Sequence, residues 1–204
     1  KASFAEQAVI FQRKHNWLMC WLYTGTFGSF IGFSAGLPLL AKQQFPEIDV
    51  LQFVFLGPLV GALSRAGTGW ASDKWGGARV TFWVFVLMML GVLGVMYFIA
   101  AASWWGFLAA FIFMFFMTGV GNASTFQMIP NIMRQEVPRL MPELAPDAAL
   151  RQAEKESAAI VGFTSAIAAY GAFFIPKSFG SAIAATGSPM AALWGFFIFY
   201  ASCA

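Results

Sequence analysis

The chain has 204 residues, of which 59% are hydrophobic and 10% are charged, and its mean hydropathy is +0.70. A soluble domain is nearer to half apolar and one quarter charged, so this composition excludes an ordinary soluble fold and predicts a surface in contact with lipid. The formal net charge of +3 is no signal for nucleic acid, because in a membrane protein the positions of the twelve basic residues set orientation.

Five apolar runs are long enough to cross a hydrocarbon core, which takes roughly 20 residues of helix. They lie at 17–40, 50–71, 80–101, 104–129 and 158–175, and a sixth run begins after Pro189 and is incomplete. Lipid admits only helices or closed barrels, and these runs lack the two-residue alternation of barrel strands. The sequence therefore predicts an all-α integral membrane bundle with six transmembrane helices, the size of one half of a transporter.

Basic residues concentrate in the connections on one side of this bundle. That side has Arg13, Lys14, Lys74, Arg79, Arg134, Arg139, Arg151 and Lys155, whereas the other side has Lys42 and Lys177. The positive-inside rule makes the richer side cytoplasmic. We therefore predict a cytoplasmic linker at 1–15, a transmembrane bundle at 16–204, and a cytoplasmic loop at 133–157 that contains a short surface helix.

Neither end of the sequence is typical of a complete protein. It opens without an initiator Met or a signal sequence, and it stops at Ala204 inside an apolar run too short to cross a membrane. We therefore expect a fragment of a longer chain whose last transmembrane helix is truncated.

Arg65 is the most informative residue within the predicted spans. It lies eight positions before Asp73, which corresponds to roughly 12 Å of helix, and a buried arginine costs about 2.5–3.5 kcal/mol on insertion scales. No Asp or Glu lies within a predicted span to neutralise it. Its planar fork of donors is suited to a planar oxyanion. The alternative is a structural arginine satisfied by helix carbonyls or reaching the interface.

Other side chains in the spans are candidates for weaker reasons. Tyr23 and Phe27 are spaced i, i+4 and share one helix face, where they offer a hydroxyl and an aromatic wall, or simply packing. Asn122 belongs to a polar group near the end of the fourth span, whose members most often hydrogen-bond neighbouring helices. Gly162 begins a series of small residues in the fifth span, suited to close packing or to a moving gate.

The connection between the second and third spans resembles a loop of the major facilitator superfamily. Residues 69–79, with Asp73, Lys74, Gly77 and Arg79, are similar to its pattern G-x-x-x-D-[RK]-x-G-[GR]-x-[RK]. In that superfamily the loop is cytoplasmic and lies between helices two and three of a six-helix half. The resemblance implies half of a twelve-helix transporter, in which Asp73 and Arg79 belong to a latch that favours one conformation.

Four further stretches resemble the nitrate/nitrite porter (NarK-type) family of that superfamily, at 26–36, 57–65, 121–129 and 162–177. The likeness covers nearly the whole chain. The fifth span is similar to the second nitrate signature of the family, although Ala168 and Ala172 stand where glycine is usual.

The resemblance also implies which residues bind the anion. In the family, the anion lies between two six-helix halves, each of which provides one arginine. Arg65 matches the arginine of the C-terminal half, and Tyr23 and Phe27 match the tyrosine that bonds the anion and the phenylalanine beside it. Ser165 falls at the polar position of the signature. The remaining candidates for signature or gating positions are Gly162, Gly171 and Asn122, with Asp73 and Arg79 in the loop.

The predicted function is therefore transport of nitrate and nitrite by alternating access, with exchange of the two anions. A nitrate/proton symporter, an anion-selective channel, and a membrane scaffold or sensor are the alternatives. No enzyme activity, catalytic residue, metal or cofactor is predicted, and Cys20 and Cys203 lie in apolar runs where thiols behave as small hydrophobes. The expected partners are the anions, lipid and an N-terminal six-helix half, in a bacterial inner membrane.

Overall fold

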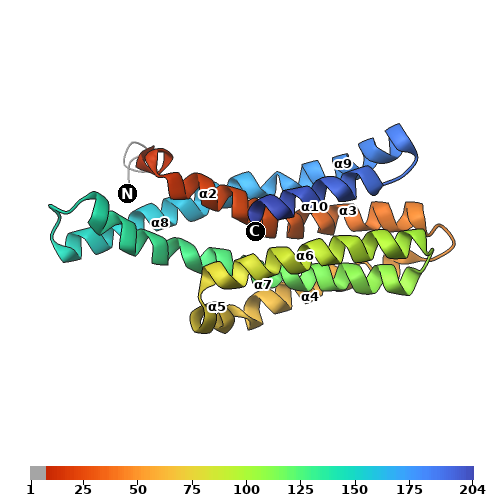
Figure 1. Cartoon of the computed structure of the whole chain (residues 1–204), viewed down its shortest axis with the longest axis horizontal. Helices are drawn as coiled ribbons and strands as arrows, with labels where there is room; N and C mark the ends of the chain where they lie inside the picture. The colour runs from red at the N-terminus through yellow and green to blue at the C-terminus, as the bar shows by residue number, and fades with distance from the viewer. Residues whose placement is uncertain (1–7) are drawn as a thin grey trace.

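The computed structural model describes residues 8–204, so residues 1–7 of the predicted linker lie outside the described part (Figure 1). Residues 8–204 contain helices and no strand, which confirms the all-α prediction. Five segments are long and apolar enough to cross a membrane: Lys14–Gln44, Val50–Gly67, Gly77–Ala100, Trp104–Leu140 and Pro146–Thr186. The sixth predicted span corresponds to a shorter apolar helix, α10 (Met190–Cys203).

A 3-10 turn at Ala8–Gln12 precedes the first of the spans. The elements of the first three spans are α2 (Lys14–Tyr23), a π-helical turn (Thr24–Gly28), α3 (Ser29–Gln44), a 3-10 turn (Val50–Gln52), α4 (Leu56–Gly67), α5 (Gly69–Trp75) and α6 (Gly77–Ala100). The rest of the chain forms α7 (Trp104–Leu140), α8 (Pro146–Ala169), α9 (Gly171–Thr186) and α10.

Two groups of helices meet along an aromatic core. In Figure 1, α2, α3, α9 and α10 run along one side of the molecule, and α4, α6 and α7 run along the other. The side chains of Phe33, Phe85, Phe111 and Phe179 are completely buried between them. Aromatic side chains bury the most apolar area of any residue, so these four rings fix how the two groups pack.

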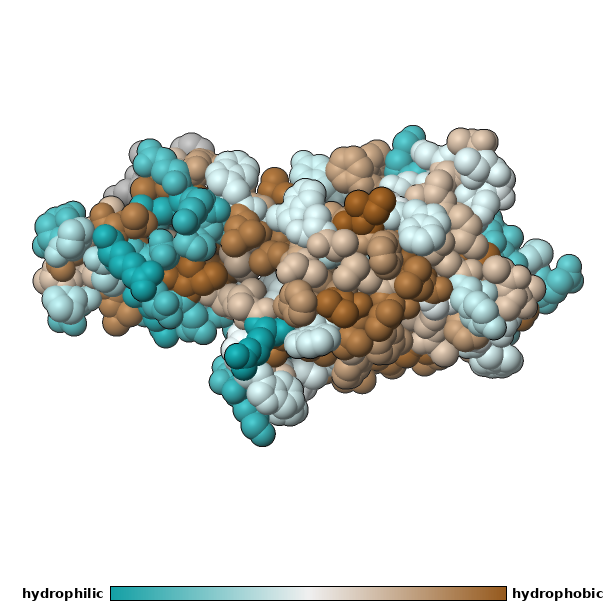
Figure 2. All heavy atoms as spheres, viewed as in Figure 1, coloured by the Kyte–Doolittle hydropathy of each residue, from teal (hydrophilic) through white to brown (hydrophobic). Residues whose placement is uncertain are grey.

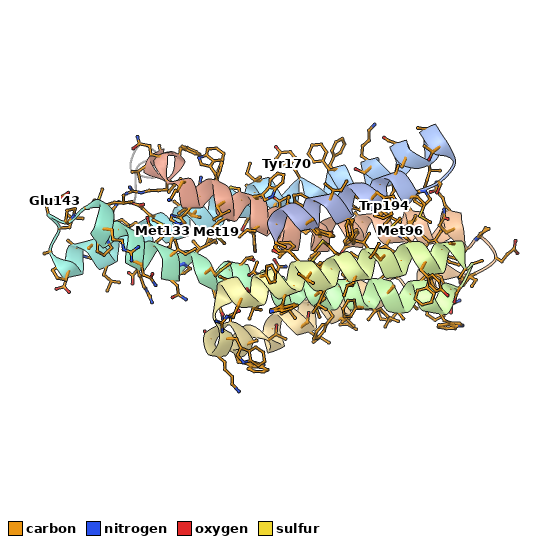
Figure 3. All side chains as sticks on the ribbon, in the orientation of Figure 1. Met19, Met96, Met133, Glu143, Tyr170 and Trp194 are labelled. Atoms are coloured by element: carbon orange, nitrogen blue, oxygen red, sulfur yellow. The ribbon has the colours of Figure 1, made fainter. Side chains whose placement is uncertain are left out.

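The structure corrects the prediction of a loop at 133–157, because most of this segment is helical. Helix α7 continues to Leu140 and α8 begins at Pro146, so that only 141–145 separates them. Figure 1 shows these two helix ends projecting beyond α5, and Figure 3 places Glu143 at the tip of the projection.

An apolar stripe explains why this segment is helical despite its prolines and charges. Ile129, Met133 and Val137 recur every four residues on α7, which places them on one face, and they form a buried cluster with Ala149 and Ala153 of α8. The same cluster includes Met19 of α2, which Figure 3 shows beside Met133. Helix packing of this kind outweighs the local cost of proline.

The second predicted span, 50–71, is also corrected, because it is not one continuous helix. Helix α4 ends at Gly67, Thr68 interrupts the helical backbone, and α5 begins at Gly69. The Ser64 carbonyl accepts hydrogen bonds from both the backbone N–H and the hydroxyl of Thr68, which closes the end of α4. Arg65 consequently lies in the last turn of a short helix and not deep within a long one.

Candidate functional site

The π-helical turn in the first span brings two of the predicted site residues together. Tyr23 ends α2, and Phe27 lies in the turn that follows. Their rings stack with centroids 5.1 Å apart and an interplanar angle of 14°, as the i, i+4 spacing predicts. Single π-helical turns occur frequently at functional sites, because the wider turn re-aims the side chains that it contains.

Arg65 lies between two aromatic rings that come from different helices. Its guanidinium carbon is 5.9 Å from the centroid of the Phe27 ring and 5.8 Å from that of Phe126 on α7. Both distances are within the range of cation–π attraction. The position in the last turn of α4 also favours a cation, because the helix dipole is negative there.

The Arg65 charge has no carboxylate partner. Within residues 8–204 its guanidinium forms no salt bridge and no hydrogen bond to a helix carbonyl, and its side chain is exposed on the surface of this chain. The alternative of an arginine satisfied by helix carbonyls therefore has no support in the described part of the chain. A cation held between aromatic rings without a counter-ion is suited to contact with an anion.

Polar groups from two other elements complete the arrangement. The Ser165 hydroxyl of α8 and the Arg65 guanidinium are both polar neighbours of the Tyr23 hydroxyl. Tyr23 is 2% exposed, so its hydroxyl is held in place by packing. The structure thus brings together Arg65, Tyr23, Phe27 and Ser165, which lie on four different elements of the chain.

Phe126 is the site residue that the sequence analysis missed. It lies within the stretch 121–129, which carries part of the family resemblance, and its signal is the i, i+4 spacing from Asn122. Aromatic residues make up 18% of the chain, so spacing alone does not separate Phe126 from rings that only pack. Its contact with Arg65 becomes visible only when α4 and α7 are placed side by side.

Asn122 behaves differently from its polar neighbours on α7. Ser124 and Thr125 form hydrogen bonds with Thr81 and Thr26 on other helices, which confirms the predicted interhelical role for those two residues. The Asn122 side chain is 1% exposed, and its Oδ1 atom has no hydrogen-bond partner among the described residues. Asn122 lies one helical turn before Phe126, on the part of α7 that approaches Arg65.

The two glycines predicted for the fifth span have unlike surroundings. A Cβ atom on Gly171 would lie 2.2 Å from the carbonyl oxygen of Gly28, so the backbones of α9 and the π-helical turn touch at this point. A Cβ atom on Gly162 would have no neighbour within 4 Å. Gly171 is therefore required for packing within this chain, whereas Gly162 lies on an open face.

The loop residues Asp73 and Arg79 are both exposed, and they do not form a salt bridge with each other within the described part of the chain. Gly76 separates α5 from α6 with a φ of 86°, a conformation that favours glycine. Gly76 therefore forms a tight turn between α5 and α6, and the Asp73 and Arg79 side chains have no salt-bridge partner among residues 8–204.

A buried ion pair lies at the predicted cytoplasmic end of the molecule. Helix α8 carries Glu156 just before the predicted span at 158–175, within the helical segment Pro146–Thr186. Arg13 donates from Nε and Nη2 to the two Glu156 oxygens, each at 2.8 Å, and the Glu156 side chain is 1% exposed. The hydrogen bond to Glu156 raises the pKa of Arg13, so the guanidinium stays charged.

The sequence of residues 1–143 matches the profile of the Major Facilitator Superfamily. That match covers more than half of the chain, which has the expected apolar helices, so the chain belongs to this superfamily and is part of an integral membrane transporter rather than an enzyme.

Its curated relatives are about twice its length. The chain is 46% identical to the nitrate/nitrite transporter NarU of Salmonella typhimurium and 44% identical to NarU of Escherichia coli, over 100% of this chain and 45% of each relative. It is 37% identical to the probable nitrate/nitrite antiporter NarK2 of Thermus thermophilus, over 98% of this chain and 43% of that relative. The chain therefore spans about half the length of the relatives it matches.

Proposed function

We propose that the protein containing this chain exchanges nitrate and nitrite across a membrane by alternating access, and that Arg65 contacts the anion. One observation carries the proposal: the Arg65 guanidinium lies between Phe27 and Phe126 and has no salt-bridge partner within residues 8–204. The relatives named as nitrate/nitrite transporters support the choice of anion.

The chemistry of the site fits a small planar oxyanion. A guanidinium group presents parallel N–H donors that match two oxygens of such an anion, and flanking rings keep water away from the pair. The Tyr23 hydroxyl, which neighbours Arg65 and Ser165, is placed to donate a further hydrogen bond. Positive charge from one arginine would then be neutralised by the anion during transport.

Removing that hydroxyl should weaken anion binding. We expect Tyr23→Phe to keep the ring stacked on Phe27 while losing about 0.5–1.5 kcal/mol of binding free energy, the net contribution of one ordinary hydrogen bond. The measurement is the half-saturation concentration for nitrate uptake into proteoliposomes containing the full-length transporter, which should rise several-fold. An unchanged value would assign Tyr23 to packing alone.

Exchange is the preferred form of energy coupling, because residues 8–204 offer no free carboxylate at the site. Glu156 is bound by Arg13 on both oxygens, and His15 lies at the predicted cytoplasmic edge, where its Nδ1 is 3.7 Å from Glu136. We expect nitrate loaded inside proteoliposomes to accelerate nitrite entry. Exchange of two monovalent anions is electroneutral, so a membrane potential, worth about 2.3 kcal/mol per charge per 100 mV, should hardly change the rate.

The alternatives give different results in the same experiment, with pH and potential clamped. Uptake driven by an inward proton gradient without internal anion would indicate a nitrate/proton symporter. Flux that does not saturate and follows the potential would indicate an anion-selective channel. Binding without flux would indicate a scaffold or sensor.

The proposal also includes a second six-helix half and the orientation of this chain in the membrane. A second six-helix half would provide another arginine opposite Arg65, and the open face at Gly162 would lie against that half or move past it. The N-terminal segment, the α7–α8 projection and the loop with Asp73 and Arg79 would face the cytoplasm of a bacterial cell, with the loop acting as a conformational latch. Gly171 would keep α9 close to the π-helical turn during the cycle.

A further inference from the structure

A groove with a volume of about 530 Å³ lies between α5, α6 and α7, away from the anion site. Its walls are largely apolar and aromatic and include Trp70, Trp75 and Trp83, with Arg79 at the α5 end. Figure 2 shows hydrophilic side chains around α5 and hydrophobic ones along α6 beyond them. The groove is thus amphipathic along its length.

None of the residues of the anion site lines this groove. Phe116 and Val120 of α7 line the groove, whereas Phe126 of the same helix contacts Arg65. On the same face of α7 as Phe126, Gly119 packs against Ser64 of α4 so closely that a Cβ atom would lie 1.9 Å from the Ser64 hydroxyl oxygen. The groove and the anion site therefore have different lining residues.

The polar end of the groove has an excess of positive charge. Arg79 lies in the first turn of α6, and the Lys74 Nζ atom is 5.8 Å from the centroid of the Trp75 ring. Neither cation forms a salt bridge within residues 8–204, and the adjacent carboxylate of Asp73 offsets only one of the two charges. An anionic group is the complementary ligand for this end.

The apolar part of the groove has the length of a lipid chain in one leaflet. Arg79 and Leu87 both line it, and Leu87 lies eight positions after Arg79, which corresponds to about 12 Å of helix. Half of a hydrocarbon core is about 15 Å thick. The exposed indole rings of Trp70, Trp75 and Trp83 lie near the charged end, as aromatic side chains do at the level of the headgroups.

We propose that this groove binds one anionic phospholipid of the cytoplasmic leaflet, with an acyl chain along α6 and the phosphate beside Arg79 and Lys74. The lipid would fix α5 against α6 at the turn that contains the superfamily loop. A surface of this kind fits a lipid better than a second protein chain, because one cationic end and one long apolar trough match a single amphipathic molecule.

The experiment measures lipid binding to the full-length transporter, so its result does not depend on the proposed transport activity. Native mass spectrometry during titration with phosphatidylglycerol or phosphatidylcholine of identical chains gives the affinity for each. We expect the wild-type protein to bind phosphatidylglycerol more tightly than phosphatidylcholine. The double variant Arg79→Gln with Lys74→Gln should lose this preference by about fivefold for each of the two cations removed. Arg151→Gln is the matched control, because Arg151 is exposed on α8 and forms no salt bridge within residues 8–204.

The position of the acyl chain is tested separately by tryptophan fluorescence. In phosphatidylcholine nanodiscs with a small fraction of chain-brominated phosphatidylglycerol, Trp83→Phe should remove more of the quenching than Trp194→Phe, although both indoles are exposed. Three results would overturn the proposal: an unchanged preference in the Arg79 and Lys74 variant, an equal loss in Arg151→Gln, or equal quenching in the two tryptophan variants. If glycerol phosphate displaced phosphatidylglycerol from the groove as strongly as unlabelled phosphatidylglycerol does, the groove would be a phosphate site and not a lipid site.

Discussion

Replacing Arg65 by lysine should abolish nitrate uptake by the full-length transporter while leaving its insertion intact. Lysine keeps the positive charge but loses the planar fork of donors, so it cannot hold two oxygens of one anion in fixed geometry. The compact ammonium is also more strongly hydrated than a guanidinium, which weakens its contacts with Phe27 and Phe126. The measurement is initial nitrate uptake into proteoliposomes at matched protein content.

Arg151→Lys is the control for that experiment, because Arg151 is exposed on α8 and has no salt bridge in the described part of the chain. It should transport at the wild-type rate. Wild-type uptake by Arg65→Lys would show that charge alone suffices and would remove the argument from guanidinium geometry.

Replacing Gly171 by alanine should destabilise the protein and impair transport. The added Cβ atom would meet the Gly28 carbonyl oxygen at 2.2 Å, and both partners are backbone, so two helices must move apart. Overpacking of this kind costs about 1–3 kcal/mol. The measurement is thermal unfolding of the full-length protein in detergent, in which the variant should melt at a lower temperature.

Gly180→Ala is the matched control for Gly171→Ala. Gly180 lies on the same helix, α9, and a Cβ atom there would have no neighbour within 4 Å. It should melt like wild type. If Gly171→Ala melted no lower than Gly180→Ala, the close approach of α9 to the π-helical turn would not contribute to stability.

The sequence predicts the helical class and the approximate places of the spans because apolar runs of sufficient length leave few alternatives in lipid. It does not predict the boundaries that depend on tertiary contacts. The end of α7 at Leu140 follows from packing of Met133 and Val137 on α8, and the break at Thr68 is stabilised by one hydroxyl. Local composition near Leu140, with prolines and charges, favours a loop, whereas the apolar run at 50–71 favours one continuous helix.

The candidate site is predictable only in part for a similar reason. The intramembrane charge of Arg65 and the shared face of Tyr23 and Phe27 follow from spacing, and the resemblance to the nitrate/nitrite porters adds Ser165. Phe126 and the pairing of Glu156 with Arg13 depend on helices that are distant in sequence. A one-dimensional pattern has no information on which faces of two helices meet.

The most direct test of the central claim is titration of nitrate onto the purified full-length transporter by isothermal calorimetry, for wild type, Arg65→Lys and Arg151→Lys. Arg65 alone among these positions lies between two aromatic rings next to the Tyr23 hydroxyl. The account predicts saturable binding with one site for wild type and Arg151→Lys, and at least tenfold weaker binding for Arg65→Lys, the ratio that about 1.4 kcal/mol gives. Equal affinity of all three proteins for nitrate would contradict it.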